Sequence, residues 1–220
     1  MNSGLQRFRH IAVEGPIGAG KSSLATRLAQ HLGAELVLEQ PGENPFLPRF
    51  YADMPGYAFQ TQLFFLFQRL RQMQALAQPS VFASAVVSDF VFAKDAIFAR
   101  VNLSDDEHRL YRQIYAQVAP QVREPDLVIW LQASPAVLLQ RIRRRGIAME
   151  HGIELAYLQR LADAYAAHFH TYDGALVFAV ATEHFNPAGR DADFAVLVER
   201  LAAFRGRREF FNSRVETTLS

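Results

Sequence analysis

The sequence contains no cysteine among its 220 residues. Its absence excludes both a disulfide framework and a thiolate zinc site, and it suits a reducing compartment, so we expect a cytoplasmic protein. Long hydrophobic runs are also missing, and residues 1–11 contain Arg7, Arg9 and His10 where a secretion signal would be apolar. No stretch approaches the length of a membrane span. We therefore expect a globular protein outside the membrane.

An excess of one charge is lacking as well, because 23 basic residues stand against 22 acidic ones and leave a formal net charge of +1. Such a balance gives no general electrostatic reason to bind a nucleic-acid polymer or an anionic membrane, so small molecules are the expected partners. Lysine is scarce: only Lys21 and Lys94 are lysines, and the other basic residues are arginines. Lys21 therefore stands out.

Half of the residues are apolar, which is enough for a sizeable core in one domain, expected over residues 1–205. Short apolar segments alternate with segments of helical periodicity, and this alternation is typical of right-handed βαβ units. We predict a three-layer α/β fold, a five-stranded parallel sheet with helices on both faces. The predicted strands are 9–14, 35–39, 85–88, 127–132 and 175–181, and the predicted helices are 22–32, 57–78, 105–119, 135–145, 154–169 and 191–204. Residues 206–220 show no clear periodicity and are expected to form a packed arm or a disordered tail of unknown role.

The strongest motif lies between the first predicted strand and the first predicted helix. Residues 15–22 read GPIGAGKS and fit G-x-x-x-x-G-K-[ST], the phosphate-binding P-loop. Its glycines let backbone N–H groups converge on phosphate oxygens, while Lys21 reaches the β- and γ-phosphates and Ser22 ligates Mg²⁺. We predict that ATP and Mg²⁺ bind here. The expected ATP-binding residues are Gly15, Pro16, Ile17, Gly18, Ala19, Gly20, Lys21, Ser22 and Ser23.

A P-loop alone does not separate a kinase from a nucleotide-dependent switch. Asp53 and Gly56 frame a D-x-x-G sequence like that of a GTPase switch, but no N-K-x-D base-recognition motif occurs anywhere in the chain. We interpret the D-x-x-G segment as a turn.

Two carboxylates follow predicted strands. Ligands of open α/β sheets bind outside the carboxyl ends of the strands, so Glu39 and Asp89 are expected in the same crevice as the P-loop. Glu39 could accept the proton of an attacking hydroxyl, and Asp89 could hold Mg²⁺ or its waters. These residues predict a catalytic site.

Four arginines end a predicted helix just before Gly146, and two of them, Arg141 and Arg145, are four residues apart and share a face. Like charges at that spacing repel, unless an anion such as a triphosphate lies between the guanidinium groups. We predict an arginine-rich lid over about residues 141–152 that closes on the phosphates during transfer.

Segments over most of the chain resemble the deoxynucleoside kinase family, most closely its bacterial purine-deoxynucleoside branch of the deoxyguanosine kinase type. The matching segments are EGPIGAGKSSL (14–24), LEQP around Glu39, NPFLPRFY (44–51), FQTQLFF (59–65), SDFVFAKDAIFA (88–99), LQASPAVLLQRIRRRG (131–146) and EHGIELAYL (150–158). The resemblance implies a P-loop kinase fold, a homodimer, and transfer of a phosphoryl group from ATP to the 5′-hydroxyl of a deoxynucleoside in nucleotide salvage.

The resemblance also implies roles for single residues. Glu39 is similar to the carboxylate beside the 5′-hydroxyl, and Arg141 and Arg145 are similar to the lid arginines. The residues that it implies for binding the nucleoside are Tyr51 and Glu150 at the sugar 3′-hydroxyl, Gln62, Arg69 and Asp95 at the base edge, and Phe98 stacked on the base. Gln62 is preferred to Gln60 because its spacings to Tyr51 and Arg69 agree with the family.

The chain departs from the family pattern at two positions. Many members have an acidic residue followed by arginine after the third strand, whereas this chain has Asp89 and then Phe90, and Ile147 replaces an arginine after Gly146. Either Glu39 or Asp89 could be the working base. The alternatives to a deoxynucleoside kinase are a nucleoside monophosphate kinase of the thymidylate kinase type and a non-catalytic nucleotide switch.

Overall fold

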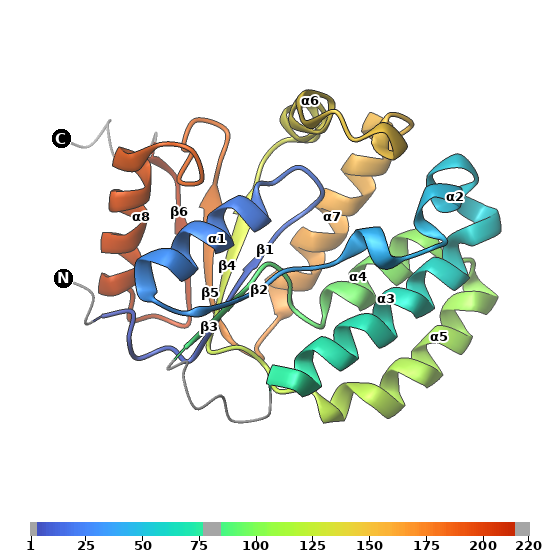
Figure 1. Cartoon of the computed structure of the whole chain (residues 1–220), viewed down its shortest axis with the longest axis horizontal. Coiled ribbons are helices and arrows are strands. Elements are labelled where there is room, and N and C mark those ends of the chain that lie inside the picture. Colours follow the sequence, from blue (N-terminus) through green and yellow to red (C-terminus); the bar gives the residue numbers. More distant parts are fainter. Residues whose placement is uncertain (1–3, 77–84, 214–220) are drawn as a thin grey trace.

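The computed structural model describes residues 4–76 and 85–213 (Figure 1). Its strands form one parallel sheet in the order β2-β3-β1-β4-β5-β6. The sheet has six strands, so the prediction of five was short by one. The strands are β1 (His10–Glu14), β2 (Glu35–Val37), β3 (Val86–Ser88), β4 (Leu127–Gln132), β5 (Leu176–Ala181) and β6 (Arg208–Phe211).

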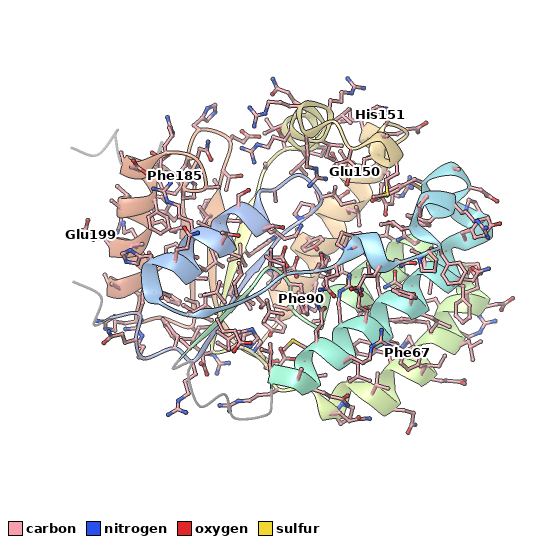
Figure 2. All side chains as sticks on the ribbon, in the orientation of Figure 1. Phe67, Phe90, Glu150, His151, Phe185 and Glu199 are labelled. Atoms are coloured by element: carbon pink, nitrogen blue, oxygen red, sulfur yellow. The ribbon has the colours of Figure 1, made fainter. Side chains whose placement is uncertain are left out.

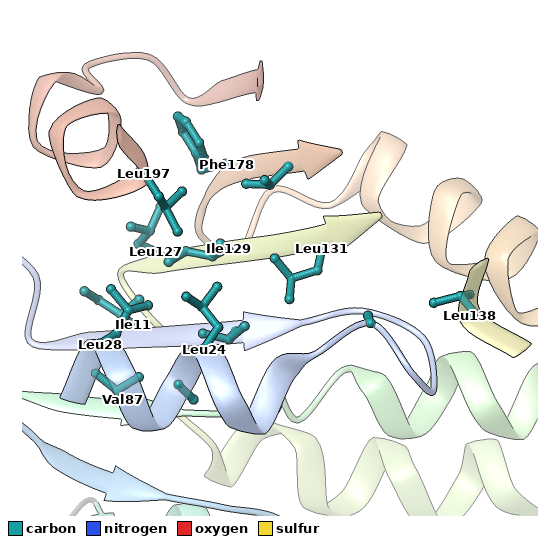
Figure 3. Close-up of a cluster of buried hydrophobic side chains, with 14 of the residues drawn as sticks. Ile11, Leu24, Leu28, Val87, Leu127, Ile129, Leu131, Leu138, Phe178 and Leu197 are labelled. Atoms are coloured by element: carbon teal, nitrogen blue, oxygen red, sulfur yellow. The ribbon is translucent and has the colours of Figure 1, made fainter. Parts of the chain in front are cut away.

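Helices cover both faces of the sheet, as predicted, because successive residues of each buried strand point to opposite sides. Ile11 and Val13 of β1 pack with Leu24 and Leu28 of α1 (Lys21–Leu32) in one cluster, which also contains Leu197 of α8 (Asp191–Ala203) (Figure 3). Ala12 lies between them in sequence and belongs to a second cluster, together with Tyr165 and Phe169 of α7 (Leu155–Thr171). The alternation of β1 therefore assigns α1 and α8 to one face and α7 to the other.

Further helices build a bundle beside the second face. This part contains α2 (Leu47–Ala52), α3 (Met54–Leu76), α4 (Lys94–Asn102) and α5 (Asp105–Val118), while α6 (Pro135–Arg145) packs on α7. Leu66 of α3, Ala99 of α4 and Tyr111 of α5 share a third buried cluster, which also encloses Phe90. The bundle brings α3 and α4 to the carboxyl edge of the sheet, next to the segments that follow β2 and β3 (Figure 1).

Most predicted elements agree with the structure, but α2, α4 and β6 were missed. Helices α2 and α4 have 6 and 9 residues, too short for a clear apolar period. Strand β6 has only four residues, Arg208–Phe211, with one fully buried side chain, and it is fixed by pairing with β5. Four residues of the expected tail therefore belong to the sheet. The predicted end of the second helix, Gln78, lies outside the described residues.

Two other expectations concern single segments. Asp53 lies between α2 and α3, and its side chain accepts a hydrogen bond from the Gly56 amide at 3.2 Å. Because α3 begins at Met54, the D-x-x-G sequence caps and begins this helix, and the prediction of a turn was wrong. Within residues 4–76 and 85–213 no helix is long and apolar enough to span a membrane.

Candidate active site

The P-loop connects β1 to the first turn of α1. Gly18 and Gly20 have φ angles of +84° and +96°, which side-chain-bearing residues rarely adopt. A Cβ atom on Gly18 would also lie 2.8 Å from the carbonyl oxygen of Leu138 in α6. The loop therefore needs glycine at both positions, and it directs the unpaired N–H groups of the α1 N-terminus towards the space where phosphates would bind.

Lys21 begins α1, and its ammonium group donates a hydrogen bond to the Pro16 carbonyl at 3.1 Å. Burial, with a further contribution from the nearby Lys94, lowers the pKa of Lys21 to about 8, although Glu14, Glu39 and Asp89 oppose the shift. An anion beside Lys21 would favour its charged form. The loop thus presents a cation for which a phosphate is a fitting partner.

Ser22 and Asp89 meet where the P-loop faces the end of β3. The Ser22 hydroxyl donates to Asp89 Oδ2, and the other oxygen, Oδ1, accepts the backbone N–H of Glu39 at 2.7 Å. The described residues contain no group of three or more His, Cys, Asp or Glu side chains that could hold a metal. Hydroxyl and carboxylate oxygens nevertheless fit Mg²⁺, which commonly takes one or two protein oxygens and completes its shell with phosphates and water.

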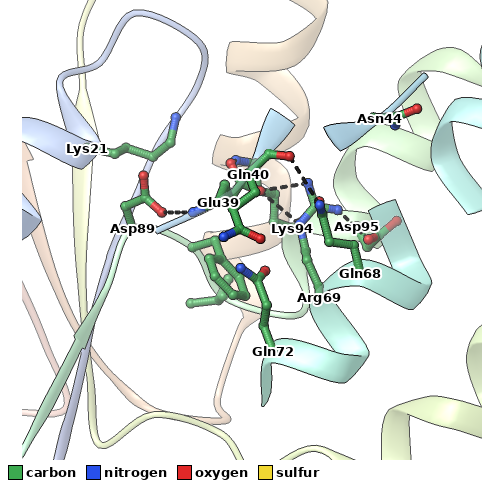
Figure 4. Close-up of polar contacts among 12 residues, drawn as sticks. Lys21, Glu39, Gln40, Asn44, Gln68, Arg69, Gln72, Asp89, Lys94 and Asp95 are labelled. Carbon is green, nitrogen blue, oxygen red and sulfur yellow. Dashed lines mark hydrogen bonds and ion pairs between the residues drawn. The ribbon is translucent and has the colours of Figure 1, made fainter. Parts of the chain in front are cut away.

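Glu39 lies two residues beyond β2 and is held by two cations (Figure 4). Its Oε1 accepts a hydrogen bond from Arg69 Nε at 2.9 Å and lies 2.7 Å from Arg69 Nη2 in an ion pair, and its Oε2 contacts the Lys94 ammonium at 2.5 Å. Burial alone would raise the pKa of Glu39, but Lys94, Arg69 and Lys21 outweigh it and lower the pKa to about 2. Glu39 is therefore an ionised carboxylate at the edge of the sheet.

Gln62 and Arg69 both contact Asp95 on α4. The Gln62 amide nitrogen donates to the Asp95 carbonyl at 3.0 Å and to its carboxylate, Arg69 donates to the same carboxylate, and the Tyr111 hydroxyl approaches it at 3.2 Å. With its nitrogen committed in this way, Gln62 keeps its carbonyl oxygen for another partner. Asp95 is fully buried behind Gln62 and Arg69 and does not line the cavity described next.

One cavity brings most of the predicted residues together. P-loop residues line it from one side and residues of α2, α3 and α4 from the other, so Lys21 and Gln62 face the same space. The predicted residues along its wall are Ile17, Gly18, Lys21, Ser22, Glu39, Tyr51, Gln62, Arg69, Asp89, Phe98, Arg145 and Glu150. Gln60, the alternative to Gln62, lies on the exposed side of α3 and donates to Gly56.

Glu150, in the segment after α6, also lines this cavity (Figure 2). Both of its carboxylate oxygens accept from Arg145 Nη2, at 2.7 and 2.6 Å. Tyr51 lies close by, and burial, together with the charge of Glu150, raises its pKa. The neutral Tyr51 hydroxyl and the Glu150 carboxylate thus offer a donor and an acceptor at one end of the cavity.

A second cavity lies on the other side of the P-loop, between α6 and the segment after β5. Gly18, Ala19, Gly20 and Ser23 line it, as do Arg141, Arg144, Arg145 and the segment 182–190. Arg141 donates to the Thr182 hydroxyl at 3.0 Å and also contacts its carbonyl. Arg145 reaches both cavities, so the arginine segment spans the space over the P-loop.

Sequence reasoning missed two charged residues of this region. Lys94 was not assigned a role, although it is the second lysine in a chain with two, and that scarcity was the available signal. Glu14 is fully buried and accepts from the Gly15 and Val91 amides and from the Tyr165 hydroxyl at 2.8, 2.9 and 2.9 Å. Burial raises its pKa, and its three hydrogen bonds fix the start of the P-loop to the segment after β3.

The parallel sheet and a P-loop that shares a cavity with convergent polar groups define a P-loop phosphotransferase. A sequence profile described as deoxynucleoside kinase matches residues 11–203. The chain belongs to the deoxynucleoside kinase family, and it is accordingly a kinase.

Individual relatives agree with this assignment. The deoxyguanosine kinase of Bacillus subtilis is 36% identical over 156 residues, which cover 70% of this chain and 75% of that relative. The deoxyadenosine kinase of Dictyostelium discoideum is 35% identical over 161 residues, which cover 71% of this chain and 64% of that protein. Among solved structures, the deoxyadenosine kinase of M. mycoides with bound dATP superposes with a TM-score of 0.73 at 25% identity, covering 88% of this chain and 98% of that one.

Proposed function

We propose that this kinase transfers the γ-phosphoryl group of ATP to the 5′-hydroxyl of a purine deoxynucleoside, deoxyguanosine or deoxyadenosine, for nucleotide salvage. One observation carries the proposal: a single cavity is lined by Lys21 and Ser22 of the P-loop and by Glu39 and Gln62. A phosphoryl donor held by the first pair would meet an acceptor held by the second pair at the carboxyl edge of the sheet.

The chemistry is an in-line displacement. The 5′-oxygen forms a bond to the γ-phosphorus, the bond from that phosphorus to the bridging oxygen of ADP breaks, and Glu39 receives the hydroxyl proton. Glu39 is a weak base, but a loose phosphoryl transition state does not require a strong one. Positioning of the reactants and electrostatic stabilisation provide most of the rate. Asp89, together with Ser22, would be engaged as a ligand of Mg²⁺, so we assign the role of base to Glu39.

Mg²⁺ would be held by Ser22 and Asp89, whose oxygens face each other beside the P-loop. When bound, it would neutralise charge on the β- and γ-phosphates. Lys21 would contact the same phosphates, and Arg141 and Arg145 would close over them from α6, where both already line the donor side of the loop.

The nucleoside would lie along α3 and α4. Tyr51 and Glu150 would bind the sugar 3′-hydroxyl, and Phe98 would stack on the base. Gln62 would accept from the base through its carbonyl oxygen, since its nitrogen already donates to Asp95. The amino groups of adenine and guanine both offer such a donor, and the names of the relatives favour a purine.

Two further properties belong to the proposal. We expect a homodimer, as the family resemblance implies. A cytoplasmic location fits the absence of cysteine from the chain.

The experiment is incubation of the purified chain with Mg²⁺ and ATP and, separately, with each deoxynucleoside and each deoxynucleoside monophosphate. We expect products from purine deoxynucleosides and none from monophosphates. Lys21→Met serves as the negative control, since it removes the phosphate-binding charge while keeping the length of the side chain.

Products from monophosphates alone would favour a nucleoside monophosphate kinase, and slow ATP hydrolysis without any phosphorylated acceptor would favour a switch. An unimpaired Lys21→Met variant would refute the P-loop assignment.

A further inference from the structure

Lys94 is a buried ammonium group beside the carboxylate that faces the acceptor. It begins α4, only 4% of its surface is exposed, and it lines the same cavity as Lys21 and Glu39. Its Nζ atom contacts Glu39 Oε2, and it lies 5.6 Å from the centre of the Phe98 ring. Burying a charge costs free energy unless the charge is paired and hydrogen-bonded, so the ammonium group of Lys94 should have such partners.

Within the described residues, the hydrogen-bond partners of Lys94 do not occupy all three N–H donors of its ammonium group. An ammonium has three donors, and one of them is committed to Glu39. That carboxylate is already held on its other oxygen by Arg69, through two nitrogens. Lys94 is therefore not required to keep Glu39 paired. It lines the cavity, where a ligand oxygen could accept its remaining hydrogens.

The position of Lys94 is between the two expected substrates. It touches Glu39, which faces the acceptor hydroxyl, and its charge is close enough to Lys21 to help lower the pKa of that residue. Asp89, directly after β3, is followed by Phe90, which is fully buried in the cluster that contains residues of α3, α4 and α5. The residue after Asp89 therefore supplies no cation to the cavity, and the first turn of α4 does.

We propose that Lys94 is a catalytic residue that hydrogen-bonds to the phosphoryl oxygens as the group moves from ATP to the 5′-oxygen. The inference rests on the proposed function and adds one residue to it. Before transfer, Lys94 pairs with ionised Glu39. As the 5′-oxygen bonds to phosphorus and ADP leaves, the hydroxyl proton neutralises Glu39, and Lys94 exchanges that partner for the new phosphate monoester.

This exchange separates Lys94 from a residue that merely positions Glu39. A positioning residue would support the deoxynucleoside and its 5′-monophosphate equally, because neither requires a direct contact with it. A residue that binds the transferred group contributes to the affinity for the monophosphate alone. The two cases can be distinguished at equilibrium, without turnover.

The test compares Lys94→Met and Lys94→Arg with wild type, and uses Arg100→Met, an exposed arginine of the same helix, as the matched control. We expect kcat of Lys94→Met to fall by about 10²-fold, as when other transition-state donors are removed. Its affinity for the 5′-monophosphate, measured by calorimetry, should fall by at least about tenfold, while affinity for the deoxynucleoside stays within about twofold. Lys94→Arg should retain more of both properties, because it keeps the charge.

Melting curves establish that each variant is folded, and Lys94→Gln replaces Lys94→Met if the latter is not. Equal losses of affinity for deoxynucleoside and monophosphate would overturn the inference in favour of positioning, as would an unchanged kcat. If wild type phosphorylates no deoxynucleoside, the proposed function itself fails. An active wild type with an unimpaired Lys94→Met variant refutes the role of Lys94 alone.

Discussion

Arg69 and Asp95 form an ion pair in which 5% and none of the respective side-chain surfaces are exposed. The pair joins α3 to α4, and each member has a second partner. Arg69 also donates a hydrogen bond to Glu39, and Asp95 also accepts one from Gln62. The buried pair therefore connects Glu39, the proposed catalytic base, to Gln62, the proposed contact of the nucleobase. Its charge balance supports both the fold and the shape of the site.

Asp95→Asn should destabilise the protein by about 3–5 kcal/mol, because it leaves the charge of Arg69 buried with one carboxylate fewer. The free energy of unfolding in urea measures this effect. Asp106→Asn is the matched control: Asp106 pairs with Arg109, but their side chains are 87% and 70% exposed, so the loss should stay within about 1 kcal/mol. Similar losses for both variants would contradict the structural role given to Asp95.

Glu39→Gln should lower kcat by about 10²–10⁴-fold, since the amide can take no proton from the attacking hydroxyl. The KM for the deoxynucleoside should change little, because the amide oxygen can still accept a hydrogen bond from Arg69. Steady-state kinetics with saturating ATP measures both constants. Glu43→Gln, at an exposed carboxylate that contacts Gln68 and lies outside the cavity, should behave as wild type. Near-normal kcat in Glu39→Gln would shift the role of base to Asp89.

Glu150→Gln should remove most of the discrimination between a deoxynucleoside and its analogue without a 3′-hydroxyl. In wild type the analogue lacks the hydroxyl that would contact Glu150, so its kcat/KM should be lower than that of the deoxynucleoside. In the variant this contact is already weakened for the deoxynucleoside, so the two kcat/KM values should lie closer together. The measurement is kcat/KM for both substrates with both proteins. The variant also loses the ionic partner of Arg145, so lower activity on either substrate is expected. An unchanged ratio between the substrates would remove Glu150 from the sugar site.

His10 should make stability depend on pH. Burial lowers its pKa to about 4, with Arg123 adding to the shift and Asp126 opposing it. Its Nε2 lies 2.9 Å from Ser88 Oγ, whose hydrogen is donated to the Phe90 carbonyl, so this nitrogen is the donor of a neutral ring. Since the unfolded chain titrates near pH 6.5, it binds the proton first, and up to about 3 kcal/mol of stability is lost as the pH falls from about 6.5 to about 4.

The replacement His10→Gln isolates this contribution. Urea unfolding at about pH 7 and about pH 5 should show wild type losing more stability than the variant, because the variant has no proton to bind at this position. His170→Gln, at an exposed histidine, should follow wild type at both pH values. Parallel losses in wild type and His10→Gln would show that other groups determine the acid response.

Local patterns were sufficient for the sheet core and the phosphate loop. The apolar runs of β1, β4 and β5 and the periodicity of α1, α6 and α8 are properties of neighbouring residues, so the sequence alone predicted these elements within a few positions. The P-loop was predictable for the same reason, because its glycines and Lys21 act together within eight residues. The parallel order of the strands then placed Glu39 and Asp89 at the same edge of the sheet.

Only the tertiary structure decided the contacts between distant segments. Strand β6 forms because β5 offers it a partner, and no pattern within its four residues reveals that pairing. Asp95 lies behind Gln62, 33 positions away, because α3 packs against α4. Lys94 of α4 meets Glu39 of the segment after β2, although the two residues are 55 positions apart. Local propensities set which elements form, but side-chain packing and the pairing of buried charges set which residues meet, and these depend on the folded chain as a whole.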